Sequence, residues 1–322
     1  MSARPKGAFL DFATVGPGVD TSALDSLIDV DYYPYSDGAE IGTRLRDCDI
    51  AILNKAALSG EVIAGSKRLK LIALQATGTD NVDTAAAKAR GIAVTNIRDY
   101  CSTAVTQHVF ALVLGLTQQI AGYDALVRSG AWQRSQTFAL FDYPIRELAG
   151  RALGIVGYGA LGQAVARFGE CLGMRVLVSA RPGSPSESVP EGRHAFETVL
   201  DEADVLSLHC PLTAATHHLI GARQLERMKS DALLINTARG GLIDSVALVQ
   251  ALQQGEIGGA GIDVLPTEPP PDDQPLLAAG IPNLIVTPHI AWAAKEARQR
   301  AMDQVTENIR EFLRGVRLRR VV

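Results

Sequence analysis

The distribution of apolar and polar residues along the chain predicts short buried strands that alternate with helices. In the first hundred residues, mainly apolar runs alternate with segments whose apolar positions recur at helical spacing. Short strands separated by helices are typical of a parallel sheet with helices on both faces. The predicted strands are residues 8–11, 49–53, 71–75 and 92–95, and the predicted helices are residues 22–28, 41–46, 60–66 and 84–89.

A second alternating series follows a long helix predicted over residues 102–121 and a polar, aromatic segment of weak periodicity over residues 122–149. A charged helix over residues 294–314 comes last. The pattern therefore predicts two sheet-and-helix units, the second more complete than the first. The strands of the second series are residues 152–156, 175–179, 205–209, 232–236, 259–264 and 284–287.

Length and composition agree with two globular domains. The chain has 322 residues, of which 47% are apolar and 20% charged, and its formal net charge is −4. This balance argues against a nucleic-acid partner. The basic residues near the end are expected to form a solvated helix terminus, and they are Arg314, Arg317, Arg319 and Arg320.

The cysteines and the apolar segments indicate a cytoplasmic protein. No two of the four cysteines form a Cys-x-x-Cys pair, so we expect neither a disulfide framework nor a metal site. The apolar run at residues 8–10 is too short for a signal peptide, and the one at residues 109–116 is too short to span a membrane. The cysteines are Cys48, Cys101, Cys171 and Cys210.

A glycine-rich turn lies between the predicted strand 152–156 and a predicted helix over residues 163–172. Gly157, Gly159 and Gly162 have the spacing G-x-G-x-x-G. The first glycine permits the tight turn, the second lets a pyrophosphate approach the backbone, and the third lets helix and strand pack closely. The helix N-terminus supplies N–H groups for the phosphates, so the turn predicts a dinucleotide site.

The strand after this turn lacks the acidic residue that usually binds the adenosine ribose. It ends in Ser179-Ala180-Arg181-Pro182-Gly183-Ser184, and no carboxylate follows before Glu187. Arg181, with Ser179 and Ser184, could bind a 2′-phosphate, because a guanidinium matches phosphate geometry. We therefore favour NADP(H). The alternative is that Arg181 is a solvated loop residue and NAD(H) is used.

Three polar residues each follow a strand of the second unit, where ligands of an open parallel sheet bind. They are Arg239, Glu268 and His289. Reduction of a 2-oxo acid needs a proton donor, which histidine supplies, and a cation for the carboxylate, which arginine supplies. A nearby glutamate would orient the imidazole. Each residue alone could be structural, but their joint placement favours catalysis.

With these features the sequence resembles the D-2-hydroxyacid dehydrogenase family, and most closely its glycerate dehydrogenase/hydroxypyruvate reductase branch. The resemblance covers nearly the whole chain. The motifs that carry it are residues 76–83, the turn at residues 157–162, His209-Cys210-Pro211-Leu212-Thr213, Asn236-Thr237-Ala238-Arg239-Gly240, Asp263 with Glu268, and Pro288-His289-Ile290-Ala291-Trp292. The branch rests on Asn54-Lys55, Thr106-Gln107-His108, residues 135–138 and residues 147–150.

The resemblance implies an α/β architecture of two doubly wound parallel-sheet domains. Residues 1–100 plus 293–322 would form a flavodoxin-like substrate domain, and residues 101–292 an inserted Rossmann cofactor domain. It also implies a homodimer. His108 is expected to be structural, and the pair His217-His218 is expected to be solvated.

The resemblance assigns roles to individual residues. His289 would be the acid/base, Glu268 its partner and Arg239 the substrate anchor. The remaining substrate contacts would be Lys55, Thr77, Gly78 and Trp292. The dinucleotide would be held by Thr106, Gly157, Gly159, Ala160, Leu161, Gly162, Ser179, Arg181, Cys210, Pro211, Thr237, Ala238, Asp263, His289 and Ala291.

The expected reaction is hydride transfer from NAD(P)H to C2 of hydroxypyruvate or glyoxylate. Two alternatives remain. One is a related dehydrogenase for another acid, of the D-lactate or phosphoglycerate type; a formate dehydrogenase would place Gln where Glu268 stands. The other is a dinucleotide-sensing binding protein, which could keep the same three residues.

Overall fold

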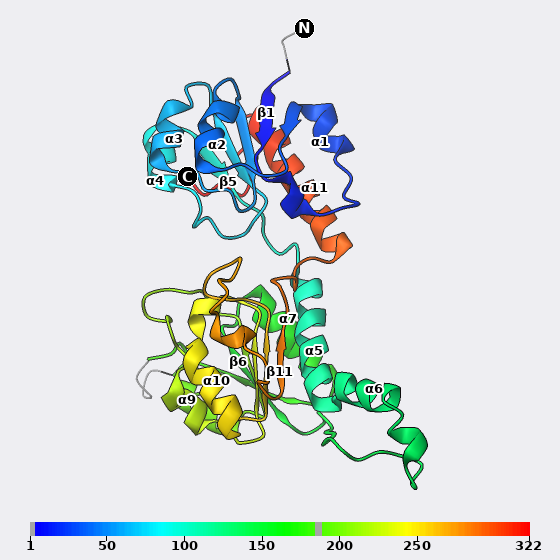
Figure 1. Cartoon of the computed structure of the whole chain (residues 1–322). Helices are drawn as coiled ribbons and strands as arrows, with labels where there is room; N and C mark the ends of the chain where they lie inside the picture. The colour runs from blue at the N-terminus through cyan, green and yellow to red at the C-terminus, as the bar shows by residue number, and fades with distance from the viewer. Residues whose placement is uncertain (1–3, 184–188) are drawn as a thin grey trace. The chain divides into compact units, whose positions relative to one another are not determined.

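The structure, a computed structural model, describes residues 4–183 and 189–322. The chain divides into two compact units (Figure 1). Unit 1 consists of Met1–Cys101 and Ala293–Val322, and unit 2 of Ser102–Trp292. Each unit is an α/β domain built on its own parallel sheet, so the predicted fold class is confirmed.

Unit 1 has a sheet of strand order β2-β1-β3-β4-β5, the order of flavodoxin-like folds. The chain returns after unit 2 to add helix α11, whose apolar face packs on one side of this sheet. The strands are β1 (Lys6–Phe9), β2 (Asp29–Tyr32), β3 (Ile50–Leu53), β4 (Leu71–Leu74) and β5 (Ala93–Thr95); the helices are α1 (Ser22–Leu27), α2 (Gly38–Leu45), α3 (Gly60–Gly65), α4 (Thr84–Ala89) and α11 (Lys295–Leu313).

The last residues of the chain complete the β5 edge of unit 1. Val321 donates a backbone hydrogen bond to Val94 at 2.7 Å, and Arg320 forms an antiparallel bridge with Thr95. Arg319 is not a solvated helix end as we expected, because its guanidinium pairs with Glu307 at 2.6 Å. The tail is therefore part of the domain rather than an appendage.

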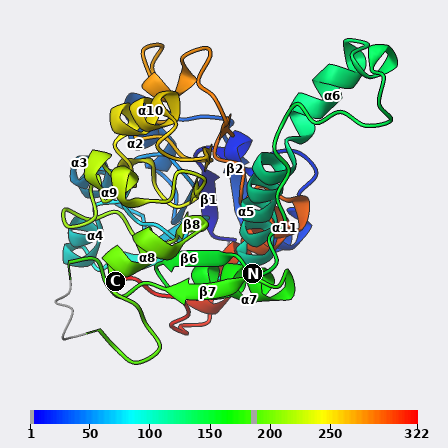
Figure 2. The same cartoon turned by 90° about the horizontal axis from the view of Figure 1, so that it is seen from below.

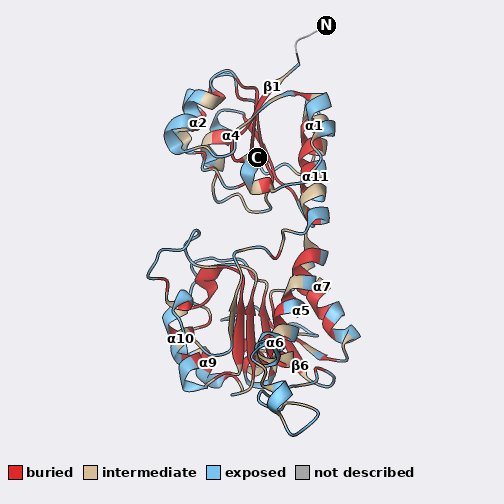
Figure 3. Ribbon diagram, turned by 45° about the vertical axis from the view of Figure 1, so that its right-hand side comes forward, coloured by how far each residue is buried: buried red, intermediate tan, exposed pale blue. Residues whose placement is uncertain are grey.

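Unit 2 has a six-stranded sheet of order β11-β10-β9-β8-β6-β7. Its buried strands lie between α9 and α10 on one face and α5 and α7 on the other (Figure 3). The strands are β6 (Ala152–Val156), β7 (Arg175–Val178), β8 (Val205–Leu208), β9 (Leu233–Asn236), β10 (Gly259–Ile262) and β11 (Leu284–Val286); the helices are α5 (Ser102–Gln118), α6 (Ile120–Arg128), α7 (Ala160–Cys171), α8 (Phe196–Glu202), α9 (Ala222–Arg227) and α10 (Ser245–Gln254).

An isolated parallel bridge between Ser179 and His194 adds a single paired residue outside β7. If this bridge counts as a reduced third strand, the sheet has the order 3-2-1-4-5-6-7, which is the 3-2-1-4-5-6 order of dinucleotide-binding folds with β11 added at the edge. The order reverses between β6 and β8, and ligands bind at such a reversal.

Two elements differ from the sequence prediction. Strand β2 was missed because it is an edge strand without a buried face. The predicted helix over residues 102–121 instead breaks at Gln119, whose φ is 51°. Helix α6 then leads away from the sheet (Figure 2), and none of its residues is buried. We call residues 119–150 the protruding segment.

Among the described helices, no single one is long and apolar enough to cross a membrane. Only α5 and α6 taken together, across a bend of 53°, have the length and composition for it.

Candidate active site

The three residues that we expected to act together follow neighbouring strands of unit 2. Arg239 comes after β9, Glu268 after β10 and His289 after β11. These strands are adjacent and parallel, so their carboxyl ends lie along one edge of the sheet. We call this the carboxyl edge.

His289 and Glu268 form a close pair at this edge. The imidazole Nδ1 lies 2.5 Å from the Glu268 Oε2, and the other carboxylate oxygen accepts the Leu265 backbone N–H at 2.9 Å. The side chains are 26% and 32% exposed, so a ligand can reach them. Because Nδ1 is occupied, Nε2 is the nitrogen available for proton exchange.

Asp263 holds the loop that carries His289. The carboxylate is 1% exposed and accepts the backbone N–H groups of Ile290 and Ala291, each at 2.9 Å. The Asp263 carbonyl accepts the His289 N–H at 2.8 Å. These bonds fix His289 at a φ of 55°, in the left-handed region that non-glycine residues rarely adopt.

The Asp263 carboxyl stays ionised although it is buried. Burial raises the pKa of this carboxyl, but hydrogen bonds from His108, Thr287 and two backbone N–H groups outweigh burial and lower the pKa below 3.8. The group is therefore an anion at neutral pH. In this structure its bonds go to the loop that carries His289.

His108, on α5, contacts the same group. Its Nε2 lies 3.0 Å from the Thr287 hydroxyl and 3.4 Å from Asp263 Oδ1. Thr287 donates its proton to Asp263 at 2.5 Å, so its oxygen accepts from His108. Sequence reasoning expected only a structural histidine. It missed this link because His108 and Thr287 are 179 positions apart.

Arg239 is presented at the carboxyl edge by a tight turn. The Asn236 side chain bonds the Arg239 carbonyl at 2.9 Å and the Ala238 N–H at 3.0 Å. Next to it, a Cβ on Gly240 would lie 2.0 Å from the Leu265 carbonyl carbon, so only glycine fits there. In the described part of the chain Arg239 is exposed and has no ion-pair partner.

The glycine turn has the geometry that a dinucleotide requires. Gly157 has a φ of 96°, and a Cβ on it would lie 2.5 Å from the Cys210 nitrogen. A Cβ on Gly162 would lie 2.1 Å from the Gly157 oxygen. Gly159, the N-cap of α7, has no atom within 4 Å of its Cβ position, which leaves the space that a pyrophosphate needs. Ala160 and Leu161 begin the helix.

Unit 2 also contains buried polar side-chain atoms without a hydrogen-bond partner. Among the described residues, the hydroxyls of Thr106 and Thr237 have no hydrogen-bond partner, as expected near a ligand site. Burial lowers the pKa of His209 to about 4, so its imidazole is uncharged at neutral pH. Cys210 is buried, whereas Pro211 is exposed. These residues fit a nicotinamide dinucleotide.

At the end of β7, the structure describes two of the three expected phosphate ligands, and one of these two is accessible. Arg181 is exposed. Ser179 is 3% exposed, and its hydroxyl donates to the Ala180 carbonyl at 2.7 Å, so its side chain turns inward. Ser184 lies outside the described residues. Of these two residues, Arg181 is therefore the one whose side chain is accessible to a phosphate, and Ser179 is not.

The remaining candidates occupy other places. In unit 1, Lys55 follows β3, and Thr77 and Gly78 follow β4. The Asp11 carboxylate accepts the Lys55 N–H at 2.5 Å, and Asn96 donates to the Thr77 carbonyl at 2.8 Å. In unit 2, Ala291 is buried and Trp292 partly buried.

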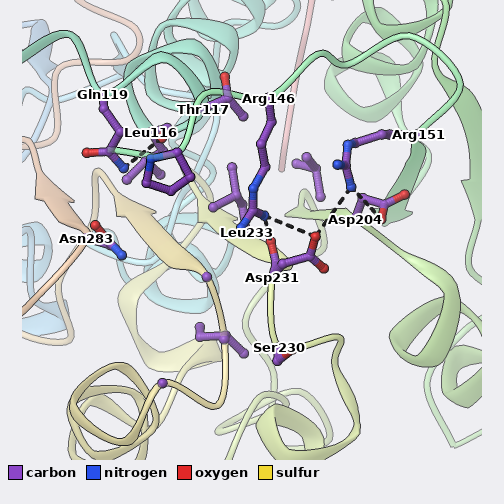
Figure 4. Close-up of a pocket in the computed structure, with 15 residues that line it drawn as sticks. Leu116, Thr117, Gln119, Arg146, Arg151, Asp204, Ser230, Asp231, Leu233 and Asn283 are labelled. Carbon is purple, nitrogen blue, oxygen red and sulfur yellow. Dashed lines mark hydrogen bonds and ion pairs between the residues drawn. The ribbon is translucent and has the colours of Figure 1, made fainter. Parts of the chain in front are cut away.

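A cavity of about 250 Å³ lies at the opposite edge of the unit 2 sheet, the amino edge (Figure 4). Arg146 pairs with Asp231 at 3.2 Å, and Arg151 reaches both Asp204 and Asp231. Lys229 adds a bond to Asp204 at 3.0 Å. Because these charged side chains are bonded to one another, we assign this cavity a structural role and the chemistry to the carboxyl edge.

Comparison with known proteins decides the family. Residues 110–291, more than half of the chain, match the D-isomer specific 2-hydroxyacid dehydrogenases over their NAD binding domain. The chain belongs to this family. The resemblance found in the sequence is thus confirmed, and the protein is a 2-hydroxyacid dehydrogenase that binds a nicotinamide dinucleotide.

Individual members of the family are similar over most of their length. A glycerate dehydrogenase of Methylorubrum extorquens is 50% identical over 276 residues, 86% of each chain. A hydroxypyruvate reductase of Blautia hydrogenotrophica is 36% identical over 311 residues, 95% of this chain and 96% of the relative. An acyclic imino acid reductase in complex with NADPH and D-Arg superposes with a TM-score of 0.84 at 28% identity, covering 98% of this chain and all of the other.

Proposed function

We propose that this dehydrogenase reduces hydroxypyruvate or glyoxylate to D-glycerate or glycolate, with NADPH as the preferred reductant. The observation that carries this proposal is the pair of His289 and Glu268 at 2.5 Å, on the sheet edge that also bears the exposed Arg239. The glycerate dehydrogenase and hydroxypyruvate reductase relatives support the substrate class.

The dinucleotide, when bound, supplies the hydride to C2 of the oxo acid. Nε2 of protonated His289 donates a proton to the carbonyl oxygen, which becomes the hydroxyl. Glu268 stabilises the imidazolium before that transfer and orients the ring. Arg239 binds the substrate carboxylate with its guanidinium and draws charge from the adjacent carbonyl.

Further contacts with the substrate come from unit 1 in this proposal. The backbone N–H groups of Thr77 and Gly78 would bind the carboxylate, and Lys55 would be a further substrate contact. In unit 2, Trp292 is the residue expected to contact the substrate. Unit 1 is then the substrate domain and unit 2 the cofactor domain.

The cofactor would lie along the glycine turn and the neighbouring strand ends. The N–H groups of Ala160 and Leu161 bind the pyrophosphate, together with Thr106. Cys210 and Pro211 border the adenine, and Thr237, Ala238 and Asp263 lie toward the nicotinamide. Arg181 binds the 2′-phosphate, which is the basis for preferring NADPH to NADH.

We also propose a cytoplasmic homodimer. The protruding segment exposes large apolar side chains, among them Trp132 at 51%, Phe138 at 90% and Phe141 at 83%. Monomeric proteins rarely leave so many together in water, and a second copy would cover them. Light scattering should give a molar mass twice that of the chain. In the double variant Phe138→Asp with Phe141→Asp, the molar mass should fall to that of a single chain.

The cysteines support the proposed cytoplasmic location. All four are free, as in a reducing compartment.

Steady-state kinetics with hydroxypyruvate, glyoxylate and pyruvate, each with NADH and NADPH, test the proposed function. We expect the largest kcat/KM with one of the first two acids. A preference for pyruvate would instead indicate a D-lactate type of enzyme. Dinucleotide binding without turnover of any 2-oxo acid would favour the sensing protein.

A further inference from the structure

We propose that Arg193 is a second specificity-determining cation that, with Arg181, binds the 2′-phosphate of NADP(H). This inference rests on the proposed function, and it adds a residue that neither the glycine motif nor the resemblance points to. It follows from where the chain places Arg193 and from what surrounds its guanidinium.

The backbone places Arg193 beside the end of β7. The Ala180 N–H donates to the His194 carbonyl at 2.7 Å, and the His194 N–H donates to the Val178 carbonyl at 2.9 Å. These bonds form the parallel bridge between Ser179 and His194. Arg193 therefore lies next to the strand end where the adenosine ribose binds in this fold, although it is 14 positions from Ser179.

The side chain of Arg193 lies between that strand end and the glycine turn. Its guanidinium carbon is 4.8 Å from the centroid of the Tyr158 ring, and its Nη1 donates to the Ser179 carbonyl at 3.4 Å. Tyr158 stands between Gly157 and Gly159 in the turn. The cation is thus held between the expected positions of the pyrophosphate and the ribose.

This arrangement leaves the guanidinium able to bind an anion. Contact with the tyrosine ring uses the face of the group, and the bond to Ser179 uses one of its five N–H donors. In the described part of the chain neither Arg193 nor Arg181 is in an ion pair. By contrast Arg175, at the other end of β7, pairs with Glu202 at 3.1 Å.

A 2′-phosphate is the anion that fits this place. It projects from the ribose, carries close to two negative charges and accepts several hydrogen bonds. Arg181 follows Ser179 by two residues and Arg193 precedes His194, so both cations lie close in sequence to the bridge that joins Ser179 and His194. NADH has only a hydroxyl at this position and would gain little from either residue.

The decisive experiment is Arg193→Ala, measured with both cofactors. We expect kcat/KM with NADPH to fall about 10- to 100-fold, the range for loss of charge-assisted hydrogen bonds, and kcat/KM with NADH to change less than about twofold. By calorimetry, binding of adenosine 2′,5′-bisphosphate should weaken by a similar factor, while binding of 5′-AMP should not change.

Two further variants control for charge and fold. Arg175→Ala removes a cation from the opposite end of β7 and should leave the ratio of the two kcat/KM values unchanged. Arg193→Lys keeps the charge but loses the planar fork, so it should recover part of the NADPH preference. Thermal unfolding of each variant should remain close to that of the native enzyme.

Equal losses with NADPH and NADH would overturn the inference, because Arg193 would then serve the pyrophosphate or the fold. In Arg193→Ala, an unchanged ratio of kcat/KM with NADPH to kcat/KM with NADH, without any loss, would overturn it as well. So would a native enzyme that binds adenosine 2′,5′-bisphosphate no more tightly than 5′-AMP. Turnover of hydroxypyruvate and glyoxylate can be measured with NADH in each case, so the proposed substrate and reaction are tested separately from this inference.

Discussion

The two edges of the unit 2 sheet use charged residues in opposite ways. At the amino edge, Arg146, Arg151 and Lys229 are bonded to Asp204 and Asp231, and their charges are satisfied within the protein. At the carboxyl edge, Arg239 is exposed without an ion-pair partner among the described residues, and the pair of Glu268 and His289 is about 30% exposed.

The difference separates structural charge from functional charge. A satisfied network contributes to stability and has little left to offer a ligand. Charged groups held in place by the backbone, with donors left over, are ready for a substrate. Mutations at the carboxyl edge should therefore change turnover, and mutations at the amino edge should change stability.

The largest effect should come from His289→Ala. Because the proton donor is lost, we expect kcat to fall about 10²- to 10⁴-fold. The dissociation constant for the dinucleotide, measured by fluorescence quenching, should change little. Full turnover in this variant would show that the carboxyl edge does not carry the chemistry.

Glu268→Gln should have the next largest effect. The amide keeps the shape but cannot stabilise an imidazolium, so we expect kcat to fall about 10- to 100-fold. In the direction of reduction, in which protonated His289 is the donor, the alkaline limb of the pH–rate profile should move to lower pH, because the His289 cation loses its partner. A profile identical to that of the native enzyme would contradict the pairing seen in the structure.

His108→Leu tests whether α5 supports the loop of His289. Loss of the donor to Thr287 and Asp263 should lower kcat about 3- to 10-fold, within the range for one hydrogen bond. His108→Gln retains an N–H donor and should recover part of that loss. If the two variants behave alike, the hydrogen bond does not position the loop.

Asp204→Ala is the matched change at the amino edge. Asp204 accepts the Ala152 N–H at 2.7 Å and pairs with Arg151 and Lys229. Its loss should lower the free energy of unfolding by about 1–3 kcal/mol and Tm by several degrees. Turnover at 25 °C should not change, and a loss of kcat would remove the distinction between the edges.

The smallest effect should be on the pH dependence of stability. Burial raises the pKa of Asp204, but the Ala152 N–H, Lys229 and Arg151 outweigh burial and lower the pKa below 3.8. Because the folded pKa is lower than the unfolded one, the stabilisation is complete above about pH 4 to 5 and is lost as pH falls below 3.8. Urea titrations at pH 3.5 and 6 should differ less in Asp204→Asn than in the native protein.

The sequence was sufficient for features that depend on local pattern. Alternating runs of apolar residues predicted both sheets, and strand ends predicted that Arg239, Glu268 and His289 share an edge. Strand β2 was missed because its residues are half exposed and lack an apolar run. The break at Gln119 was missed because a left-handed residue leaves no signal in apolar periodicity.

Links between distant segments could not be predicted from one sequence. The contact of His108 with Thr287 and the position of Arg193 beside Ser179 depend on tertiary packing. Ser179 was expected to face the cofactor because it ends a strand, but its hydroxyl bonds the neighbouring carbonyl. The roles of the site residues remain predictions.

The pairing of the last residues with β5 has a consequence for folding during synthesis. Helix α11 and the residues that follow it belong to unit 1, yet the ribosome makes them only after all of unit 2. Unit 2 is continuous and can fold as soon as it emerges. The first hundred residues cannot complete the core on one face of their sheet until α11 has been made, so unit 1 is expected to finish folding after unit 2.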